Sequence, residues 1–343
     1  MDNENIYWDI SRPLSYNCLF NFIIGPRGAG KTYGALKYAI SQYLKHKAKG
    51  EEWQFLYVRR MARELEKLTK MRGGRLFNAV KAEFPNHILK AESNILYCDG
   101  KVMGYAQELS TGSILKSDSF PNVNFIIFDE FIIDNVGTYH YLKDEVTKFF
   151  DLYETIARMR NNCIVFFLSN AVSIANPYFD YFRLNKPANN DIQRFGQCKD
   201  ILVQNVVVEK YVEAKKNTRF GKLLEGTEYG DYAIDNNWLL DNDDFLARKN
   251  KNCIYFVTLR YKNNWLGIWY DENEYIFYVS NDVDLQYKFK FSTTTADHKP
   301  NIALMKSNSP YISALLSAYR NGYVRYENMK LKAWFLEIMR MTL

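Results

Sequence analysis

The chain contains few of the residues that bind zinc. Its 343 residues include five cysteines, an odd number that lie far apart, and four scattered histidines. Because no C-x-x-C pair is present, this composition argues against a zinc site. Cys18 and Cys163 adjoin apolar segments, so we expect buried, reduced thiols of an intracellular protein.

Long apolar runs are also missing. No run approaches the ~20 residues of a membrane-spanning helix. The first twenty residues carry Asp2, Glu4 and Asp9 and lack the apolar core of a signal peptide. We therefore expect a soluble, cytoplasmic protein without a membrane partner.

The remaining composition is that of a globular protein with room for two domains. Apolar residues make up 47% and charged residues 24% of the chain, so each domain can bury a core. The formal net charge of +6 permits a polyanionic partner but does not require one, since the same charge suits a solvated surface.

The most informative segment is a glycine-rich loop that satisfies the pattern G-x-x-x-x-G-K-[ST] in full. It comprises Gly25, Pro26, Arg27, Gly28, Ala29, Gly30, Lys31 and Thr32. Apolar residues 19–24 predict a strand before it, and the spacing of residues 33–44 predicts a helix after it. Such glycines let backbone N–H groups close around phosphate oxygens. The loop therefore predicts a nucleoside triphosphate site with Lys31 on the β- and γ-phosphates and Thr32 on Mg²⁺. The alternative is an ordinary turn before a helix.

Two acids follow a second apolar segment, residues 125–128. In open α/β sheets ligands lie at the carboxyl ends of the strands, so Asp129 is expected to hold Mg²⁺ and Glu130 to orient or deprotonate the attacking water. Two solvated acids are the alternative. Asn170, which follows Ser169 after the next apolar strand, either senses the γ-phosphate or caps the strand end.

Several basic residues are further candidates. Arg158 ends a predicted helix, residues 145–158, and Arg160 lies just after it. An arginine directed at a neighbour's γ-phosphate can add a factor of about 10³–10⁵ to the rate. On most helices arginines are simply solvated. A basic series either neutralises phosphates of the nucleotide or DNA or belongs to a mixed-charge solvated helix. It consists of Arg59, Arg60, Arg63, Lys67, Lys70, Arg72 and Arg75.

The order of these segments predicts an α/β fold. Alternating strands and helices in the first half indicate a mainly parallel sheet with helices on its faces, and Asp99-Gly100 suits the turn of a hairpin between residues 94–98 and 101–106. A basic linker at residues 208–230 is expected to join residues 1–207 to a smaller α+β domain, residues 231–343. There, residues 254–261, 265–270 and 275–280 predict an antiparallel meander, followed by helices at 310–320 and 328–341.

Together these residues resemble the DNA-packaging ATPases of small tailed bacteriophages that prime replication with a protein (Salasmaviridae type). The matching strings run through nearly the whole chain: residues 22–31 (FIIGPRGAGK), 57–60 (YVRR), 128–131 (FDEF), 168–172 (LSNAV), 176–178 (NPY), 218–221 (TRFG) and 226–230 (GTEYG). The resemblance implies a P-loop NTPase domain of the additional-strand, catalytic-glutamate type. It also implies an RNase H-like second domain that has lost its metal site.

The resemblance also implies a function. Members of this family form a ring, a pentamer, on the portal of an empty capsid and use ATP and Mg²⁺ to drive double-stranded DNA inward, in the host cytoplasm. It places Lys31 and Thr32 in the phosphate loop, Asp129 at the metal and Glu130 as the catalytic carboxylate. Arg158 falls on the trans-acting arginine, and Lys116 on a basic residue that acts between subunits.

Other features of the family stay open. Some members dock through a packaging RNA, which the basic patches here would suit. Thr258 and Arg260 stand where a nuclease would carry acids, so DNA cleavage is not expected. Two rival functions remain: a DNA-stimulated helicase or chromosome-pumping ATPase, and a scaffold that uses ATP only as a structural ligand.

Overall fold

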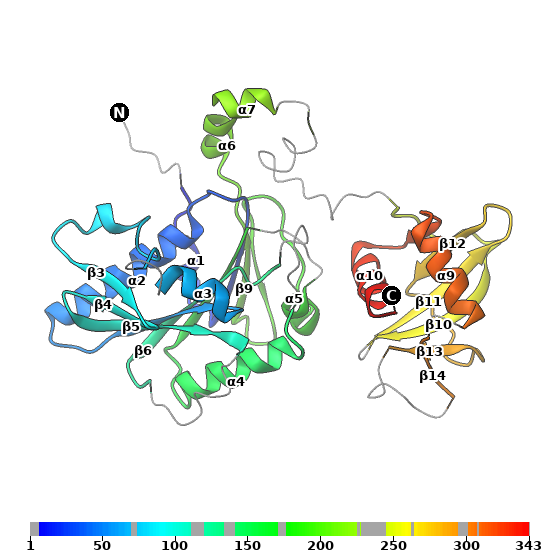
Figure 1. Ribbon diagram of the computed structural model, residues 1–343, viewed down its shortest axis with the longest axis horizontal. Helices are drawn as coiled ribbons and strands as arrows, with labels where there is room; N and C mark the ends of the chain where they lie inside the picture. The colour runs from blue at the N-terminus through cyan, green and yellow to red at the C-terminus, as the bar shows by residue number, and fades with distance from the viewer. Residues whose placement is uncertain are drawn as a thin grey trace. The chain divides into compact units, whose positions relative to one another are not determined.

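A nine-stranded sheet with a parallel centre is the frame of the first half of the chain (Figure 1). Its order is β3-β4-β5-β2-β6-β7-β1-β9-β8, with β5, β2, β6, β7, β1 and β9 parallel. The strands are β1 Phe20–Ile24, β2 Gln54–Arg59, β3 Leu89–Glu92, β4 Ile95–Cys98, β5 Lys101–Glu108, β6 Val123–Asp129, β7 Ile164–Ser169, β8 Ile192–Phe195 and β9 Ile201–Asn205. The central strands are largely apolar because both faces are covered.

Helices cover the two faces of this sheet and create two separate cores. Helix α2 (Lys31–Ala48) packs with Leu36 and Ile40 on one face, and α4 (Glu145–Ala157) packs with Phe149 and Leu152 on the other. The remaining helices are α1 Ser11–Leu14, α3 Ala62–Thr69, α5 Pro177–Phe182, α6 Glu209–Lys216 and α7 Arg219–Leu223, with a 3-10 turn at Lys81–Glu83. The carboxyl ends of β1, β2, β6 and β7 thus lie at one edge of a covered sheet.

The computed structural model describes residues 7–69, 74–110, 120–133, 141–170, 176–224, 227, 245–261, 264–293, 301–306 and 309–342. The chain divides into two units, Met1–Leu240 and Asp241–Leu343. Helices α6 and α7, inside the linker expected at residues 208–230, belong to the first unit by this division. The boundary expected at residue 231 stays a prediction. In the described part of the chain, no helix is long and apolar enough to span a bilayer.

The second unit is built on a six-stranded sheet of order β14-β13-β10-β11-β12-β15. Its elements are β10 Ile254–Tyr261, β11 Asn264–Asp271, β12 Ile276–Ser280, β13 Lys290–Ser292, β14 Ala303–Leu304, α9 Pro310–Arg320, β15 Val324–Tyr326 and α10 Met329–Thr342. Strands β10, β11 and β12 form an antiparallel meander, and β13 pairs parallel with β10. The meander and both helices confirm the sequence-based prediction.

The Asp99-Gly100 hairpin is also confirmed, because both residues have positive φ, 54° and 73°, as a type I′ turn requires. Other elements were not predicted. Strand β9 pairs parallel with β1, and β3 and β8 extend the sheet at its two antiparallel edges. These short strands have too few residues to show a period in the sequence.

Candidate phosphate and metal site

The glycine loop connects the carboxyl end of β1 to the first turn of α2, as predicted. Gly28 and Gly30 have φ of 88° and 86°, and Gly30 is the N-cap residue of α2. Glycine adopts this left-handed conformation without the penalty of a Cβ. The backbone therefore curves back on itself immediately before a helix N-terminus, the arrangement that binds phosphate.

Lys31 is buried inside this curve, with 3% of its surface exposed. Its ammonium donates to the carbonyls of Gly25 and Pro26 at 2.9 and 2.7 Å. Burial lowers the pKa of Lys31 to about 7, against the opposing effect of the Asp129 charge. An anion bound in the loop would favour the charged form of the lysine.

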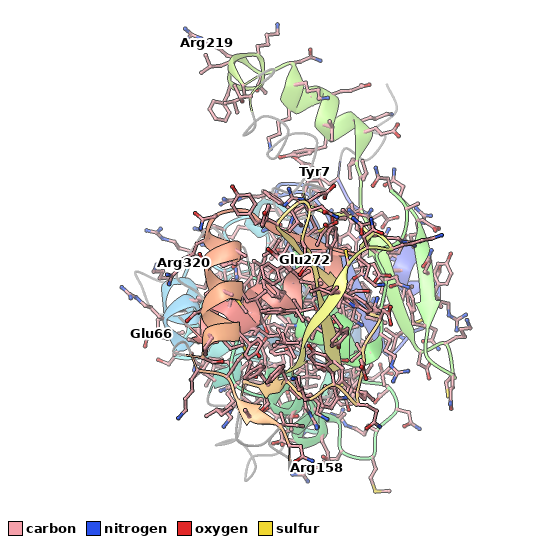
Figure 2. All side chains as sticks on the ribbon, turned by 90° about the vertical axis from the view of Figure 1, so that its right-hand side faces the viewer. Tyr7, Glu66, Arg158, Arg219, Glu272 and Arg320 are labelled. Atoms are coloured by element: carbon pink, nitrogen blue, oxygen red, sulfur yellow. The ribbon has the colours of Figure 1, made fainter. Side chains whose placement is uncertain are left out.

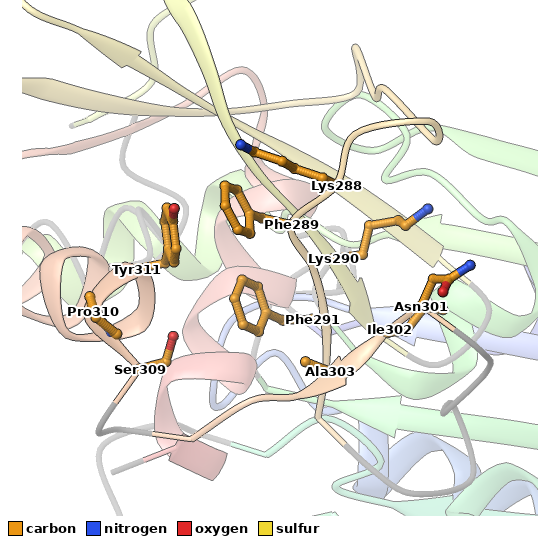
Figure 3. A pocket seen from close by; sticks show the side chains of 10 residues that line it. All are labelled: Lys288, Phe289, Lys290, Phe291, Asn301, Ile302, Ala303, Ser309, Pro310 and Tyr311. Atoms are coloured by element: carbon orange, nitrogen blue, oxygen red, sulfur yellow. The ribbon is translucent and has the colours of Figure 1, made fainter.

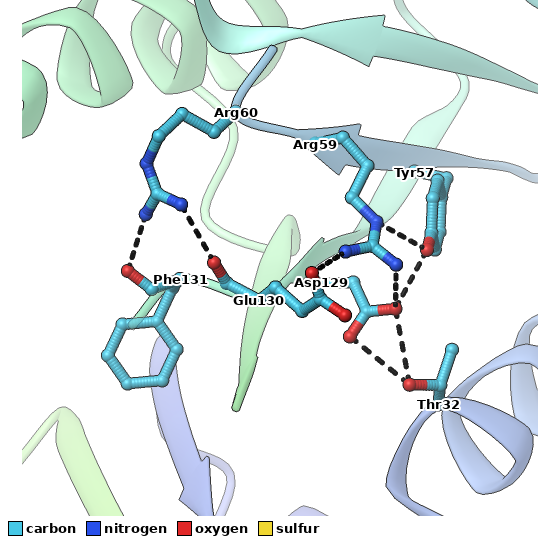
Figure 4. A network of polar contacts seen from close by, with 7 residues as sticks. All are labelled: Thr32, Tyr57, Arg59, Arg60, Asp129, Glu130 and Phe131. Atoms are coloured by element: carbon cyan, nitrogen blue, oxygen red, sulfur yellow. Dashed lines mark hydrogen bonds and ion pairs between the residues drawn. The ribbon is translucent and has the colours of Figure 1, made fainter. Parts of the chain in front are cut away.

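Asp129, the last residue of β6, is the centre of a polar network (Figure 4). Its carboxylate accepts from the Thr32 hydroxyl at 3.1 and 3.2 Å and from the Tyr57 hydroxyl at 2.7 Å. Burial raises the pKa of Tyr57 well above its usual value, so this hydroxyl remains a donor. The two residues expected to hold Mg²⁺, Thr32 and Asp129, are thus in direct contact although they are far apart in the sequence.

Arg59 bridges both predicted acids. One of its nitrogens lies 3.4 Å from the Asp129 carboxylate, and another lies 2.5 Å from that of Glu130 (Figure 4). Its Nε also donates to the Tyr57 hydroxyl at 3.1 Å. Glu130 has a positive φ of 59° and a side chain that is 50% exposed. The residue expected to act on water is therefore accessible and paired with an arginine.

Arg60 has a different partner. It is 3% exposed and forms a bidentate ion pair with the buried Glu145 at the start of α4. This corrects the interpretation of the basic series. Arg59 ends β2 and Arg60 follows it, and both pair with acids, so for these two residues the solvated-helix alternative is wrong.

Arg63 and Lys67, the next members of the series, lie on α3. They line a pocket of about 210 Å³ together with Arg59 and Glu130. Glu64 of α3 also lines this pocket, which thus joins the exposed carboxylate to a helix face of mixed charge. Arg75 is exposed, and Lys70 and Arg72 lie outside the described residues.

Three other candidates are Asn170, Arg160 and Lys116. Asn170 follows β7 directly, and the pairing of Ser169 with Ile24 of β1 places it beside the start of the glycine loop. Arg160 is held by hydrogen bonds to Asn124, Phe120 and Ile156 at 2.7–3.0 Å. Lys116 lies outside the described residues.

Arg158 lies at the edge of the sheet opposite the glycine loop. It is exposed and caps the carboxyl end of α4, a helix whose first residue, Glu145, contacts Arg60 at the carboxyl end of β2. Figure 2 shows Arg158 near the bottom of the view and Tyr7, which lies by the glycine loop, in its upper part. Arg158 therefore cannot reach the loop of its own chain.

One family model matches this chain from residue 1 to residue 343, that of the podovirus DNA encapsidation protein (Gp16). The chain is a member of the Gp16 family. It is 37% identical to the DNA packaging protein of Bacillus phage B103 over 95% of this chain and 98% of that protein. It is 34% identical to that of Bacillus phage phi29 over 98% of both.

Solved structures support the same assignment. This Gp16-family chain superposes on a chain of the phi29 viral genome packaging motor assembly with a TM-score of 0.76 and 33% identity, covering 98% of this chain and 99% of that one. The N-terminal domain of the phi29 DNA packaging ATPase matches with a TM-score of 0.51 and 36% identity, over 59% of this chain and 96% of that domain. The resemblance inferred from the sequence is confirmed, and so is a mostly parallel α/β first unit.

The Gp16-family chain has a second pocket of about 520 Å³ in its C-terminal unit, between β13 and α9 (Figure 3). Phe289 and Tyr311 lie with ring centroids 4.2 Å apart, and the Lys288 ammonium lies 4.7 Å from the Phe289 centroid. Aromatic rings beside lysines are suited to stacking and charge contacts with nucleic acid. Sequence reasoning did not identify this pocket.

Sequence reasoning also missed the residues that position the acids of this Gp16-family site. Tyr57 is part of an apolar strand, and nothing in its spacing separates it from a core residue. Glu145 was predicted only as the start of a helix. The one available signal was the pair Arg59-Arg60 at a strand end, where unpaired arginines would be costly to bury.

Proposed function

We propose that this DNA packaging motor protein binds and hydrolyses ATP at the Gly25–Thr32 loop and uses the energy to translocate double-stranded DNA into a preformed capsid. The contact between Thr32 and the Asp129 carboxylate carries the proposal. It brings the end of the phosphate loop together with the acid that follows a buried strand. Arg27, Ala29 and the other loop residues except Pro26 would supply backbone N–H groups, and Asn170 would lie near the γ-phosphate.

The residues present fit a magnesium ion. The Thr32 hydroxyl and the Asp129 carboxylate are hard oxygen ligands, and Mg²⁺ is usually bound by one or two such groups together with substrate phosphates. When bound, the ion would bridge phosphate oxygens and neutralise developing charge. Glu130, exposed and beyond this pair, would accept a proton from the attacking water.

The strand order supports the additional-strand type of P-loop NTPase. Strand β7 lies between β1, which leads into the loop, and β6, which ends in Asp129. We infer that the chemistry is completed by a neighbouring subunit in a homo-oligomeric ring, which we expect to be a pentamer. The position of Arg158, at the edge away from its own loop, supports a role in trans, and Lys116 is proposed to assist between subunits.

Partners follow from the same proposal. The ring would sit on the portal of the prohead in the host cytoplasm and grip DNA through its phosphates, so DNA binding should be tolerant of sequence and weaken with salt. Arg63, Lys67 and the exposed Arg75 are described residues of the basic series that remain candidates for such contacts. A packaging RNA between ring and portal is compatible with the basic surface.

We infer that the C-terminal unit, with its parallel β13 beside an antiparallel meander, is an RNase H-like module that binds nucleic acid or the portal without cutting. The Thr258 hydroxyl, on the central strand, donates to the Asp284 carbonyl at 2.9 Å. A two-metal nuclease needs carboxylates at such positions. Nicking of plasmid DNA by the full chain with Mn²⁺, abolished by Asp282→Asn or Asp284→Asn, would refute this inference.

The direct test is DNA packaging with purified protein, portal-bearing proheads and genomic DNA. We expect ATP-dependent protection of DNA from nuclease that is lost in Lys31→Ala and Glu130→Gln, while Glu130→Gln still binds ATP. Strand separation on a forked substrate without protection inside proheads would favour a helicase. Equal protection with ATP and with the non-hydrolysable analogue AMP-PNP would favour a structural role for the nucleotide.

A further inference from the structure

Two tyrosines that are distant in the sequence meet beside the glycine loop. Tyr7 precedes β1, and Tyr211 lies on α6, beyond the last parallel strand. Their ring centroids are 6.5 Å apart and their planes are tilted by 44°. Tyr33, in the first turn of α2, lies 6.2 Å from Tyr7. Three aromatic rings therefore gather at the helix end where the triphosphate is proposed to bind.

The first two rings belong to residues that touch the loop itself. A Cβ added at Gly28 would lie 2.0 Å from the Tyr211 hydroxyl, and one added at Gly30 would lie 2.9 Å from the Tyr7 Cβ. The Tyr211 hydroxyl also donates to the Arg27 carbonyl at 3.2 Å. Both tyrosines thus pack on the two positions where the loop backbone has positive φ.

The neighbours of Tyr7 hold it in place while Tyr7 itself remains 52% exposed. The backbone N–H of Trp8 donates to the Ala29 carbonyl at 2.8 Å, and its indole N–H donates to Gln204 of β9 at 2.9 Å. Trp8 is buried. An accessible aromatic ring is therefore fixed by a buried anchor directly against the phosphate loop, which is how a preformed ligand site is built.

We propose that Tyr7 and Tyr211 form a stacking site for the purine base of the nucleoside triphosphate. This assignment rests on the proposed function. A planar base between two rings needs about 7 Å at a stacking separation of ~3.4 Å on each side, and the observed separation is 6.5 Å. Rotation of either the Tyr7 or the Tyr211 ring by the 44° tilt would make the two ring faces parallel, as stacking on both sides of a base requires.

Stacking recognises the face of a base and not its polar edge. The site therefore distinguishes nucleotides from base-free polyphosphates and discriminates weakly between adenine and guanine. Because Tyr211 belongs to α6, the base also adds contacts to the helix that follows the sheet. Occupation of the base site thus stabilises the beginning of the segment leading to the C-terminal unit.

The test compares an ATP analogue, AMP-PNP, with inorganic tripolyphosphate, both with Mg²⁺, as ligands of the full chain. Tyr7→Ala and Tyr211→Ala should each weaken AMP-PNP binding by about 5- to 100-fold and change tripolyphosphate binding by less than about twofold. Tyr7→Phe and Tyr211→Phe keep the ring and should bind AMP-PNP nearly as the parent does. Tyr181→Ala, at a 60% exposed tyrosine of α5, is the matched control.

If the alanine variants bind both ligands more weakly to the same degree, the tyrosines shape the loop and do not bind the base. If they bind AMP-PNP as tightly as the parent does, or more tightly, the tyrosines only cover the loop. Either result overturns the base site. Amide hydrogen exchange provides a second test, made on the unsubstituted protein. AMP-PNP should slow exchange in α6, whereas tripolyphosphate should not, and equal effects would also overturn it. If Lys31→Ala binds both ligands like the parent, the proposed triphosphate site itself has failed.

Discussion

Arg60 and Glu145 form a buried, bidentate ion pair. Arg60 Nε and Nη2 lie 2.8 and 3.0 Å from the two carboxylate oxygens. The same guanidinium donates to the carbonyls of Glu130 and Phe131 at 3.0 and 2.6 Å. The pair therefore fastens the loop that carries Glu130 to the start of α4.

Breaking this pair should destabilise the first unit. Glu145→Ala leaves a buried guanidinium without its counter-charge, and such a loss costs about 3–5 kcal/mol. Denaturant unfolding of the full chain, followed by a signal from the first unit, measures the change. Glu92→Ala removes the carboxylate of an exposed pair with Lys90, 2.6 Å apart, and should cost less than about 1 kcal/mol. Equal destabilisation by the two variants would contradict this prediction.

Arg59 should restrain hydrolysis before the motor is engaged. Its ion pair with Glu130, 2.5 Å long, occupies a carboxylate oxygen that would otherwise accept the proton of the attacking water. We expect Arg59→Ala to raise ATP turnover without DNA or proheads by about fivefold, the equivalent of a partly exposed pair worth about 1 kcal/mol. Steady-state phosphate release measures it, with Arg59→Lys as the charge-preserving control. A loss of turnover of roughly a hundredfold would instead indicate that Arg59 stabilises the transition state.

Thiol labelling should report the buried cores. Burial raises the pKa of Cys163 to about 12 and, together with Asp99, that of Cys98 to about 11. Their thiolate fractions at pH 8 are therefore roughly 10⁻⁴ and 10⁻³. Of the five cysteines, Cys198 is exposed and the other four are buried. One thiol should react quickly with an aromatic disulfide at pH 8, and the other four only after denaturation.

Raising the pH toward 11 should speed the labelling of Cys98 before that of Cys163, since the thiolate forms as the pH approaches the pKa. Cys198→Ser is the control and should have no fast thiol at pH 8. Fast labelling of Cys98 or Cys163 in that variant, located by peptide mapping, would mean that the core around β4 or β7 is open to solvent.

The sequence alone was sufficient to locate functional residues that are adjacent to one another in the chain. The glycine loop between β1 and α2 depends on eight adjacent residues, and Asp129-Glu130 follow an apolar strand directly, so both could be located. The contact of Thr32 with Asp129 was an inference from the parallel sheet. Arg60 and Glu145 meet only because α4 begins beside the end of β2, and no local pattern encodes that approach.

The alternatives for Arg59 and Arg60 in the basic series also depend on contacts that are not local in the sequence. Arg59 and Arg60 follow the apolar residues of β2 and precede α3, a pattern equally typical of a solvated helix start or a phosphate-binding face. Which one holds depends on where Asp129, Glu130 and Glu145 lie in three dimensions. A single sequence shows which residues are charged, but it does not show which of them form ion pairs.

The last prediction concerns action between subunits. If Arg158 acts on the nucleotide of a neighbour, Arg158→Ala should keep ATP binding and lose most hydrolysis, because one such arginine contributes about 10³–10⁵ in rate. Glu130→Gln should do the same. Arg160→Ala, in contrast, removes hydrogen bonds to Asn124 and Phe120 within the same chain and should lower thermal stability instead.

Mixing the two inactive variants separates action in trans from action in cis. In a mixed ring, an Arg158→Ala subunit retains Glu130, and a neighbouring Glu130→Gln subunit can supply the missing arginine. ATP turnover should therefore reappear on mixing and peak near equal proportions, whereas each variant alone stays inactive. Turnover that remains absent at every mixing ratio, in preparations shown to contain mixed rings, would remove Arg158 from the site.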